Sequence, residues 1–319
     1  MSLEQTLLDG TLSPSFTVAR IFHRLQLARA RHHDALVCYR LNGRDLLLPL
    51  SHDLPWNRRV FPTYSDNLRR LATFVRQRTG ALRLIDAGAN IGDSWALCGS
   101  RAGDAFLLIE GSPIWFSLLE RNTAADPAVV RVQSLLSDHP GAAAGAILAE
   151  DGNARVVEGA GGGLEAETLD RLVERHPAFR AANLLKVDVE GWDPKVLRGA
   201  RALLADAGPV LLFEHHPRLL ALAGENDRAV FAELAELGYS RPILYDNVGL
   251  LIGALDAADG SRLGALVDEA RRRDGYYYDV VAFSDRDADA REAFLASEVA
   301  WYAGQSMGRP GPDSATAGS

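Results

Sequence analysis

The sequence predicts an α/β protein with a mostly parallel, doubly wound sheet, and two observations lead to that class. First, five short apolar runs alternate with helix-like stretches from residue 82 onward, a pattern typical of a sheet with helices on both faces. Second, Ser112-Pro113 and Asp193-Pro194 each place a cap residue before proline, which suits the first turn of a helix. The five predicted strands are residues 82–86, 105–110, 129–135, 184–189 and 209–214.

The first 64 residues predict an N-terminal extension of a helix and a hairpin. Residues 13–31 have a rough apolar stripe, with Ser15 as a candidate cap, and are therefore expected to be helical. Residues 35–50 predict two short strands around an Asn42-Gly43 turn. We expect the extension to act as a lid or as the arm of a homodimer.

The main domain is expected to span residues 65–303. It begins with a helix at 65–79, which Gly80 ends. Residues 141–163 are rich in Gly and Ala and interrupt the rhythm, so a surface insertion is favoured over a hairpin with a mobile loop. Further expected elements are a helix at 261–273, a last strand at 276–283 and a disordered, Gly-, Pro- and Ser-rich tail at 304–319.

Composition and charge exclude several classes of partner. The 319 residues are 47% apolar and 24% charged, which is ordinary for a globular protein. The net charge of −8 argues against a nucleic-acid partner, and no run of eighteen apolar residues predicts a membrane span. The N-terminus lacks a basic leader, and Cys38 and Cys98 suggest buried thiols in a reducing compartment. We therefore expect a cytoplasmic protein that acts on a small molecule.

The stretch L-I-D-A-G-A-N-I-G at residues 84–92 predicts a ligand site. Asp86 ends the first strand, and Gly88 and Gly92 shape the turn into the next helix, at the sheet edge where ligands bind. The stretch has neither the Lys of a P-loop nor the G-x-G-x-x-G of a dinucleotide site. S-adenosylmethionine fits better, because Asp86 can face its cationic side while backbone amides take its carboxylate.

The ends of the second and third strands add polar groups to this site. Glu110 ends the second strand, where an acid can accept both ribose hydroxyls of a cofactor. Ser137-Asp138 follows the third strand, near where adenine would lie, and Asp138 could accept from its amino group. Helix capping is the alternative role for Asp86 and Glu110, and an ordinary turn is the alternative for Ser137-Asp138.

The fourth and fifth strands predict the reactive part of the site. The alternation of a strand places Lys186, Asp188 and Glu190 on one face, with Asp188 near the methyl group or the nucleophile. In F-E-H-H-P, either Glu214 or His215 could act as a general base. Asp188, Glu190, Glu214 and His215 could instead hold Mg²⁺, but no dense acidic pattern supports this and no metal site is predicted.

These motifs, in this order and spacing, resemble the FkbM-type methyltransferases over roughly residues 60–285. The resemblance rests on L-I-D-A-G-A-N-I-G-D-S, I-E-G-S-P, L-L-S-D, E-T-L-D-R-L, L-L-K-V-D-V-E-G-W-D-P-K-V-L-R-G-A and L-L-F-E-H-H-P. It implies a Rossmann-like class I fold, S-adenosylmethionine as methyl donor, and methylation of hydroxyl oxygens on secondary metabolites, polyketides or sugars. Gly111-Ser112 and Trp192 depart from the family pattern; Trp192 either walls the acceptor pocket or packs elsewhere.

The resemblance also implies roles for individual residues. Asp86, Gly88, Asn90 and Gly92 look like the cofactor loop, Glu110 like the ribose acid, Ser137-Asp138 like the adenine turn, and Asp188 and Glu190 like the acids of the active-site strand. Glu214, Glu190 and His215, in that order, are the expected general bases. The alternatives are a metal-dependent hydrolase using the Asp188, Glu190, Glu214 and His215 cluster, a nicotinamide dehydrogenase, and a non-catalytic binding protein of the same fold.

Overall fold

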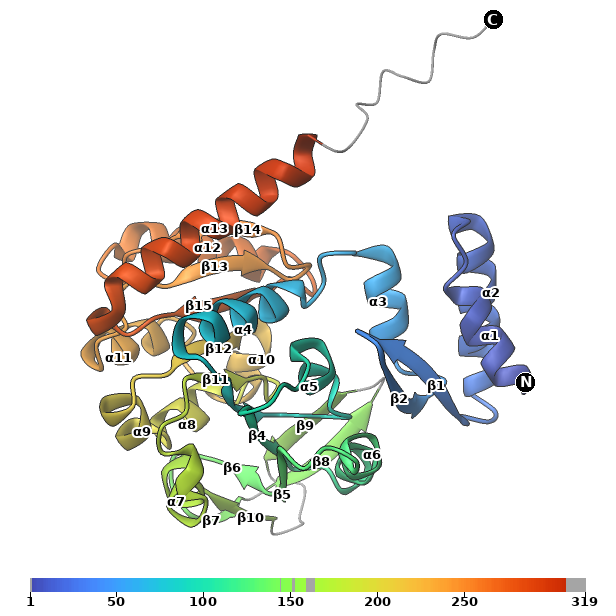
Figure 1. Ribbon diagram of the computed structural model, residues 1–319, viewed down its shortest axis with the longest axis horizontal. Helices are drawn as coiled ribbons and strands as arrows, with labels where there is room; N and C mark the ends of the chain where they lie inside the picture. The colour runs from blue at the N-terminus through green and yellow to red at the C-terminus, as the bar shows by residue number, and fades with distance from the viewer. Residues whose placement is uncertain (1, 144, 151–152, 159–163, 308–319) are drawn as a thin grey trace, which may run out of the picture.

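The computed structural model describes residues 2–143, 145–150, 153–158 and 164–307, and it is built around one eight-stranded sheet (Figure 1). The strand order is β14-β13-β15-β12-β11-β3-β4-β5. The neighbours from β12 to β5 pair in parallel, whereas β15 pairs antiparallel with both β12 and β13. The predicted doubly wound, mostly parallel sheet is therefore confirmed. Its strands are β3 (Arg83–Ala87), β4 (Ala105–Glu110), β5 (Val129–Gln133), β11 (Leu184–Val187), β12 (Val210–His215), β13 (Ile243–Asp246), β14 (Leu251–Ala254) and β15 (Tyr278–Ala282).

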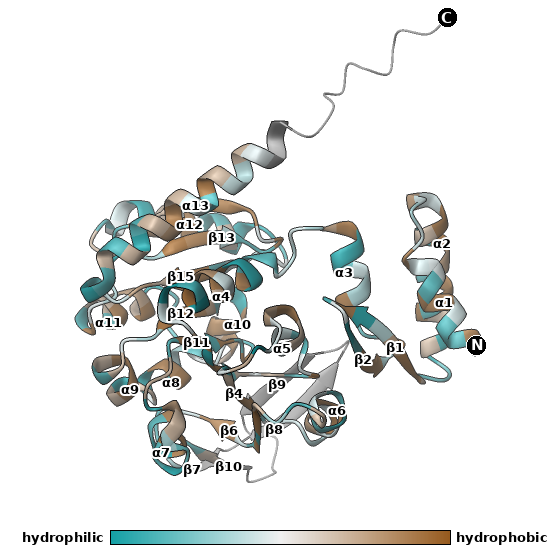
Figure 2. Ribbon diagram, viewed as in Figure 1, coloured by the Kyte–Doolittle hydropathy of each residue, from teal (hydrophilic) through white to brown (hydrophobic). Residues whose placement is uncertain are grey.

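Helices bury both faces of this sheet because successive strand residues point to opposite sides. In β4, Phe106 and Leu108 belong to one buried cluster, and Leu107 and Ile109 belong to the other. The covering helices alternate between hydrophobic and hydrophilic segments, as Figure 2 shows. The first cluster includes residues of α4 (Asp66–Thr79), α5 (Asp93–Cys98), α6 (Pro113–Thr123) and α13 (Ala288–Met307). The second includes residues of α7 (Leu169–Arg175), α8 (Asp193–Arg198), α9 (Arg201–Asp206), α11 (Ala229–Glu236) and α12 (Gly260–Arg272), and α10 (Pro217–Leu222) contacts α12.

The N-terminal extension contains the predicted helix and hairpin together with two unpredicted helices. The hairpin turns through Asn42 and Gly43, whose positive φ angles of 48° and 82° suit a tight hairpin turn. Asn122 of α6 anchors it to the main domain by exchanging hydrogen bonds with the backbone of Leu47. In Figure 1, the first two helices lie on the outer side of the hairpin. The elements are α1 (Leu3–Thr11), α2 (Phe16–Ala30), β1 (Leu36–Leu41), β2 (Arg44–Pro49) and α3 (Leu54–Val60).

The apolar stripe predicted for α2 does not pack inward. Phe16, Ile21 and Leu25 are 48%, 54% and 51% exposed, and the buried residues of this helix are Ala19 and Gln26. The Gln26 amide donates to the Leu50 carbonyl and accepts from the Thr11 hydroxyl, so a polar network attaches α2 where an apolar stripe was expected. Ser15 occupies the cap position without making a side-chain cap hydrogen bond.

Several boundaries differ from the sequence prediction. The strand expected at 184–189 ends at Val187, and the one expected at 129–135 ends at Gln133, followed by the two-residue β6 (Leu135–Leu136). Within 141–163 the structure has β7 (Gly141–Ala143) and an antiparallel hairpin of β8 (Gly145–Glu150) and β9 (Asn153–Glu158), the alternative that was not favoured. Residues 159–163 lie outside the described residues; β10 (Leu164–Glu167) follows and joins β6 and β7 in a small sheet.

One of the two predicted helix starts and the beginning of the predicted tail differ from the structure. Ser112 precedes α6 as predicted, but Asp193 is the first residue of α8 rather than its cap. Helix α13 continues to Met307, four residues into the predicted tail, whose remainder at 308–319 lies outside the described residues. Among the described residues, no helix combines the length and the apolar character needed to cross a membrane.

Candidate functional site

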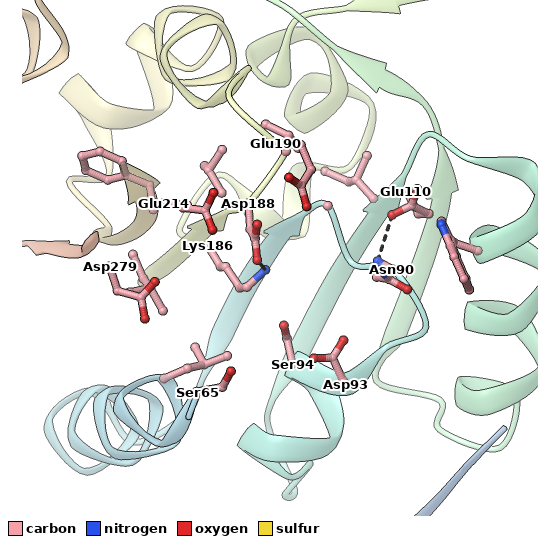
Figure 3. A pocket seen from close by; sticks show the side chains of 18 of the residues that line it. Ser65, Asn90, Asp93, Ser94, Glu110, Lys186, Asp188, Glu190, Glu214 and Asp279 are labelled. Atoms are coloured by element: carbon pink, nitrogen blue, oxygen red, sulfur yellow. Dashed lines mark hydrogen bonds and ion pairs between the residues drawn. The ribbon is translucent and has the colours of Figure 1, made fainter. Parts of the chain in front are cut away.

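A cavity of about 450 Å³ opens where the parallel strands of the main sheet end (Figure 3). Residues that close or follow four of these strands line it: Gly88 and Asn90 after β3, Glu110 in β4, Asp188 after β11 and Glu214 in β12. This is the sheet edge at which ligands of doubly wound folds bind. The site predicted from the strand ends is therefore a real cavity, although not every predicted residue reaches it.

The glycine turn after β3 is held tightly against the neighbouring strand. Gly88 has a φ of +86°, and a Cβ at this position would lie 1.9 Å from the backbone oxygen of Asp188. Its N–H donates to the Ile109 carbonyl at 2.9 Å. No other residue fits this turn without displacing the Asp188 backbone. The turn therefore brings bare backbone to the cavity wall, where a ligand can approach it closely.

Glu110 fixes this turn from the next strand. Its Oε2 accepts the Asn90 N–H and its Oε1 accepts the Ser112 N–H, both at 2.8 Å. The side chain is 6% exposed, and burial raises its pKa while the two N–H donors oppose that shift. Because each carboxylate oxygen has a second lone pair, Glu110 can still accept hydrogen bonds from a ligand in the cavity.

Two residues of the predicted cofactor loop do not line the cavity. Gly92 has a φ of +90° and precedes α5, and a Cβ there would lie 3.1 Å from Leu119, so the position serves the turn and its packing. Asp86 is fully buried. The expectation that Asp86 faces the ligand directly is wrong in this structure, because the buried side chain does not line the cavity.

Asp86 instead faces Lys186, its register partner on the parallel strand β11. The Lys186 ammonium lies 3.3 Å from Asp86 Oδ1 and 3.1 Å from Asp188 Oδ2. Burial raises the pKa of Asp86 to about 6, although Lys186 opposes the shift. Burial would lower the pKa of Lys186, but Asp188 and Asp86 raise it well above its ordinary value. The lysine therefore links the buried acid to an acid on the cavity wall.

The predicted adenine turn also lies away from the cavity. Ser137 is 5% exposed and bonds to Asp138 at 3.2 Å, and Asp138 Oδ2 accepts from Arg198 Nε at 3.2 Å. Neither residue lines the cavity, and residues 134–136 line it instead. The reason lies in the strand pairing. β6 pairs with β10 in a separate small sheet, and the Ser137-Asp138 turn that follows β6 therefore lies away from the main sheet.

The two adjacent histidines point in different directions. His215 is 1% exposed; its Nε2 lies 2.5 Å from the Asp227 carbonyl and its ring lies against Phe231. It does not reach the cavity, so it is wrong as a candidate base. His216 lines the cavity and stacks on Tyr277 at 5.6 Å between ring centroids. The alternation of side chains along a strand could have identified His216, because it places His216 on the same face as Glu214.

Sequence reasoning missed several residues that complete the cavity. Asp279 of β15 pairs in register with Glu214 of β12, and its Oδ2 accepts from Asn67 Nδ2 at 2.7 Å. Burial raises the pKa of Asp279 to about 7, and burial together with nearby acids raises the pKa of Glu214 well above its ordinary value. No short motif contains these contacts, because β15 follows β12 by more than sixty residues in the chain. Other lining residues that the sequence did not single out are His52, Asp53, Asn57, Asp93 and Ser94.

Glu190 and Trp192 follow β11 in the chain, and both line the cavity. Trp192 is 5% exposed and lines the cavity, and the Lys195 ammonium lies 3.9 Å from the centre of its ring. Of the two roles considered for Trp192, the structure thus places it in the wall. Glu190 adopts a φ of +54° in the turn after the strand and also lines the cavity.

The charges around the cavity favour a cationic ligand. Among the described lining residues, Lys186 is the single lysine or arginine, against seven carboxyl side chains. The four residues considered for Mg²⁺ do not converge, because His215 is turned away. In the part of the chain that the structure describes, no three His, Cys, Asp or Glu side chains are arranged to hold a metal ion. The seven carboxyl residues are Asp53, Asp93, Glu110, Asp188, Glu190, Glu214 and Asp279.

Comparison with known proteins gives a family match. Residues 86–241 match the model of the methyltransferase FkbM domain, whereas no curated protein matches the chain. Among solved structures, methyltransferase FkbM from Methylobacillus flagellatus KT is 15% identical with a TM-score of 0.32, covering 66% of this chain and 47% of that one. This chain thus spans about half the length of that protein.

Two further structures show the same level of similarity. Precorrin-6y C5,15-methyltransferase from Geobacter metallireducens GS-15 is 12% identical with a TM-score of 0.37, covering 67% of this chain and 87% of that one. An O-methyltransferase from Bacillus cereus in complex with SAH is 12% identical with a TM-score of 0.36, covering 68% and 80%. The matched domain and the strand order of the central sheet give the chain the predicted Rossmann-like class I methyltransferase fold, and residues 86–241 are similar to the methyltransferase FkbM domain.

Proposed function

We propose that the protein transfers a methyl group from S-adenosylmethionine to a hydroxyl oxygen of a small molecule, such as a secondary metabolite or a sugar. The observation that carries the proposal is the pairing of the Gly88 turn with Glu110 at the edge of a strongly acidic cavity. A donor with two cationic groups suits such a cavity, whereas a pyrophosphate would be repelled by it. The family match supports the reaction class.

The residues at the Glu110 end of the cavity fit this donor. Glu110 is placed to accept ribose hydroxyls, and the backbone around Gly88 can be approached closely. The indole N–H of Trp115 is buried without a hydrogen-bond partner, so it is free for a ligand. The donor would supply a methyl group activated by its sulfonium. The protein would hold the acceptor in line with that group.

The acceptor hydroxyl must lose its proton, and the carboxyl groups beyond Lys186 can receive it. Glu190 and Glu214 both line this part of the cavity. Burial and nearby acids raise the pKa of Glu214, so it holds a proton more tightly than an ordinary carboxylate does. His216 joins them as a candidate in place of His215, and burial lowers its pKa so that its imidazole is neutral. Proton transfer to one of these groups would leave the oxygen free to attack.

Calorimetric titration with S-adenosylmethionine and S-adenosylhomocysteine tests the donor site. We expect the wild type to bind both, and Glu110→Gln to bind about tenfold or more weakly, because an amide cannot accept both N–H groups and a ribose. Glu120→Gln is the matched control, since Glu120 is exposed on α6. Absence of binding by the wild type would refute the donor assignment. Formation of S-adenosylhomocysteine with a panel of hydroxylated metabolites would then identify the acceptor.

A further inference from the structure

We infer that the acceptor half of the cavity holds a protonated amine of the substrate between Glu214 and Asp279, against the rings of Tyr64 and Tyr277. The inference rests on the proposed methyl transfer and narrows its substrate to molecules that carry an ammonium group. It concerns how the acceptor is recognised, and the hydroxyl remains the group that receives the methyl.

The two carboxyl groups face the same space from neighbouring strands. Glu214 and Asp279 are directly opposed in the antiparallel register of β12 and β15, and Figure 3 shows both side chains at one end of the cavity. Opposed residues in such a pair have Cβ atoms about 5 Å apart, so one ammonium can reach both. Like charges in this position destabilise a sheet, which makes the pair costly unless a ligand compensates for it.

Glu214 points to a missing hydrogen-bond donor. Its Oε1 is buried and has no hydrogen-bond partner, although buried carboxyl oxygens normally have one. Asp279 differs, because Asn67 donates to its Oδ2 and fixes the side chain in place. An ammonium has three donors, enough to satisfy Glu214 Oε1 and to bond to Asp279 at the same time. One carboxyl group is therefore held rigidly while the other lacks its partner.

Among the described lining residues, Lys186 is the single lysine or arginine, and its attraction offsets the effect of burial on Asp279 only in part. Asp188, Glu190 and Asp193 add negative charge around Glu214, and Asp188 and Asp246 do so around Asp279. Lys186 lies between Asp86 and Asp188 and is already engaged by both. Burial raises the pKa of Asp279 to about 7 and raises that of Glu214 well above its ordinary value, so a bound cation would relieve an existing electrostatic cost.

The aromatic walls favour an organic ammonium over a metal ion. Tyr64 and Tyr277 both line the cavity, and Tyr277 stacks on His216 with 21° between the ring planes. Burial raises the pKa of both tyrosines, with nearby acids such as Glu214 contributing, so their rings are neutral. Neutral aromatic faces attract ammonium groups and the carbon atoms attached to them, whereas Mg²⁺ requires oxygen ligands and water.

The test uses small probes in place of the unidentified substrate. Primary ammonium ions from methylammonium to cyclohexylammonium are each paired with the neutral alcohol of the same carbon skeleton. Binding to the full chain is measured at pH 8 by ligand-observed NMR, with and without saturating S-adenosylhomocysteine. We expect at least one ammonium ion to bind about tenfold more tightly than its alcohol, because only the cation interacts with both carboxylates.

Two variants and a control localise the binding. Asp279→Asn retains the bond to Asn67, and Glu214→Gln retains the side-chain shape, so both are expected to fold and to lose the preference for ammonium. Glu120→Gln, on the surface of α6, should retain it. The preference should also weaken by about tenfold from pH 8 to pH 6, because Asp279, whose pKa is about 7, becomes protonated and stops attracting the cation.

The outcomes separate this inference from the proposed function. Alcohols that bind as well as ammonium ions, an Asp279→Asn variant that retains the preference, or Mg²⁺ that displaces the ammonium ion would each overturn the amine subsite. If S-adenosylhomocysteine binds in the same samples, the donor site stands even when the amine subsite fails. Ammonium preference without S-adenosylhomocysteine binding would support the subsite and refute the methyltransferase assignment.

Discussion

The two ends of the cavity differ in how their polar groups are satisfied. At the donor end, Glu110 accepts two backbone N–H groups, and the Gly88 turn is locked against β11. At the acceptor end, Glu214 has a buried oxygen without a partner and faces a second acid across the strand pair. The first end is held by the protein's own hydrogen bonds, whereas the second still lacks a compensating charge.

At the donor end, Glu110 joins consecutive βα turns, and the Gly88 turn packs against Asp188 from a distant part of the chain. These contacts lie within the protein, so this end can form before any ligand arrives. The acceptor end depends on residues from α4, β12 and β15, which meet only when the whole sheet has assembled. Substitutions at the two ends should therefore have different consequences, and three predictions test this, from the largest expected effect to the smallest.

Gly88→Ala should have the largest effect. Its Cβ would lie 1.9 Å from the Asp188 carbonyl oxygen at a φ of +86°, so the turn must open. We expect a loss of about 3 kcal/mol or more in the free energy of unfolding, together with loss of S-adenosylhomocysteine binding. Gly43→Ala is the matched control, because Gly43 has a φ of +82° with no atom within 4 Å of a Cβ.

Urea unfolding and calorimetry measure both quantities for the two glycine variants. The control should lose only about 1 kcal/mol from backbone strain and should bind S-adenosylhomocysteine normally. Equal losses of stability in the two variants would show that the close approach to Asp188 is not what holds the donor end together.

Asp279→Asn should stabilise the ligand-free protein, with an effect that depends on pH. The folded-state pKa of about 7 lies above the ordinary 3.8, so the folded protein binds this proton more tightly than the unfolded chain does. Ionisation therefore costs stability as pH rises from about 4 to about 7, and the variant avoids that cost. We expect no difference near pH 4 and a gain above pH 7 of at most about 4 kcal/mol.

Denaturant melts at pH 4, 6 and 8 check this pH dependence. Glu120→Gln, which removes an exposed carboxyl group, should show a difference close to zero throughout. A destabilised Asp279→Asn variant at pH 8 would contradict the view that the acceptor end carries an uncompensated charge.

Asp138→Asn should have the smallest effect on the cavity. The sequence prediction places Asp138 against adenine, whereas the structure directs it toward Arg198 and away from the cavity. We therefore expect the affinity for S-adenosylhomocysteine to change by less than about twofold, with stability reduced by about 1 kcal/mol or less. Calorimetry measures this affinity for Asp138→Asn and Glu110→Gln side by side. A tenfold loss of affinity in both variants would show that Asp138 does contact the adenine.

Local sequence patterns predicted the elements whose conformation depends on residues that are close together in the chain. The Asn42-Gly43 hairpin, the parallel strands from β3 to β12 and the Gly88 turn follow from backbone preferences and alternation within a few residues. Helix α2 is also located correctly, but its apolar stripe is exposed because a buried Gln26 network attaches the helix. Periodicity identifies a helix without identifying the face that its neighbours will cover.

The sequence by itself determined the fold class, the similarity to the FkbM domain and the strand ends at which the site forms, because these depend on motifs and on alternating apolar runs. Tertiary structure alone decided which of those side chains reach the cavity. It buried Asp86, turned His215 away, and placed Asp279 opposite Glu214. The physical reason is that register and strand order set the neighbours of a charged side chain, and neither is encoded in a short stretch of sequence.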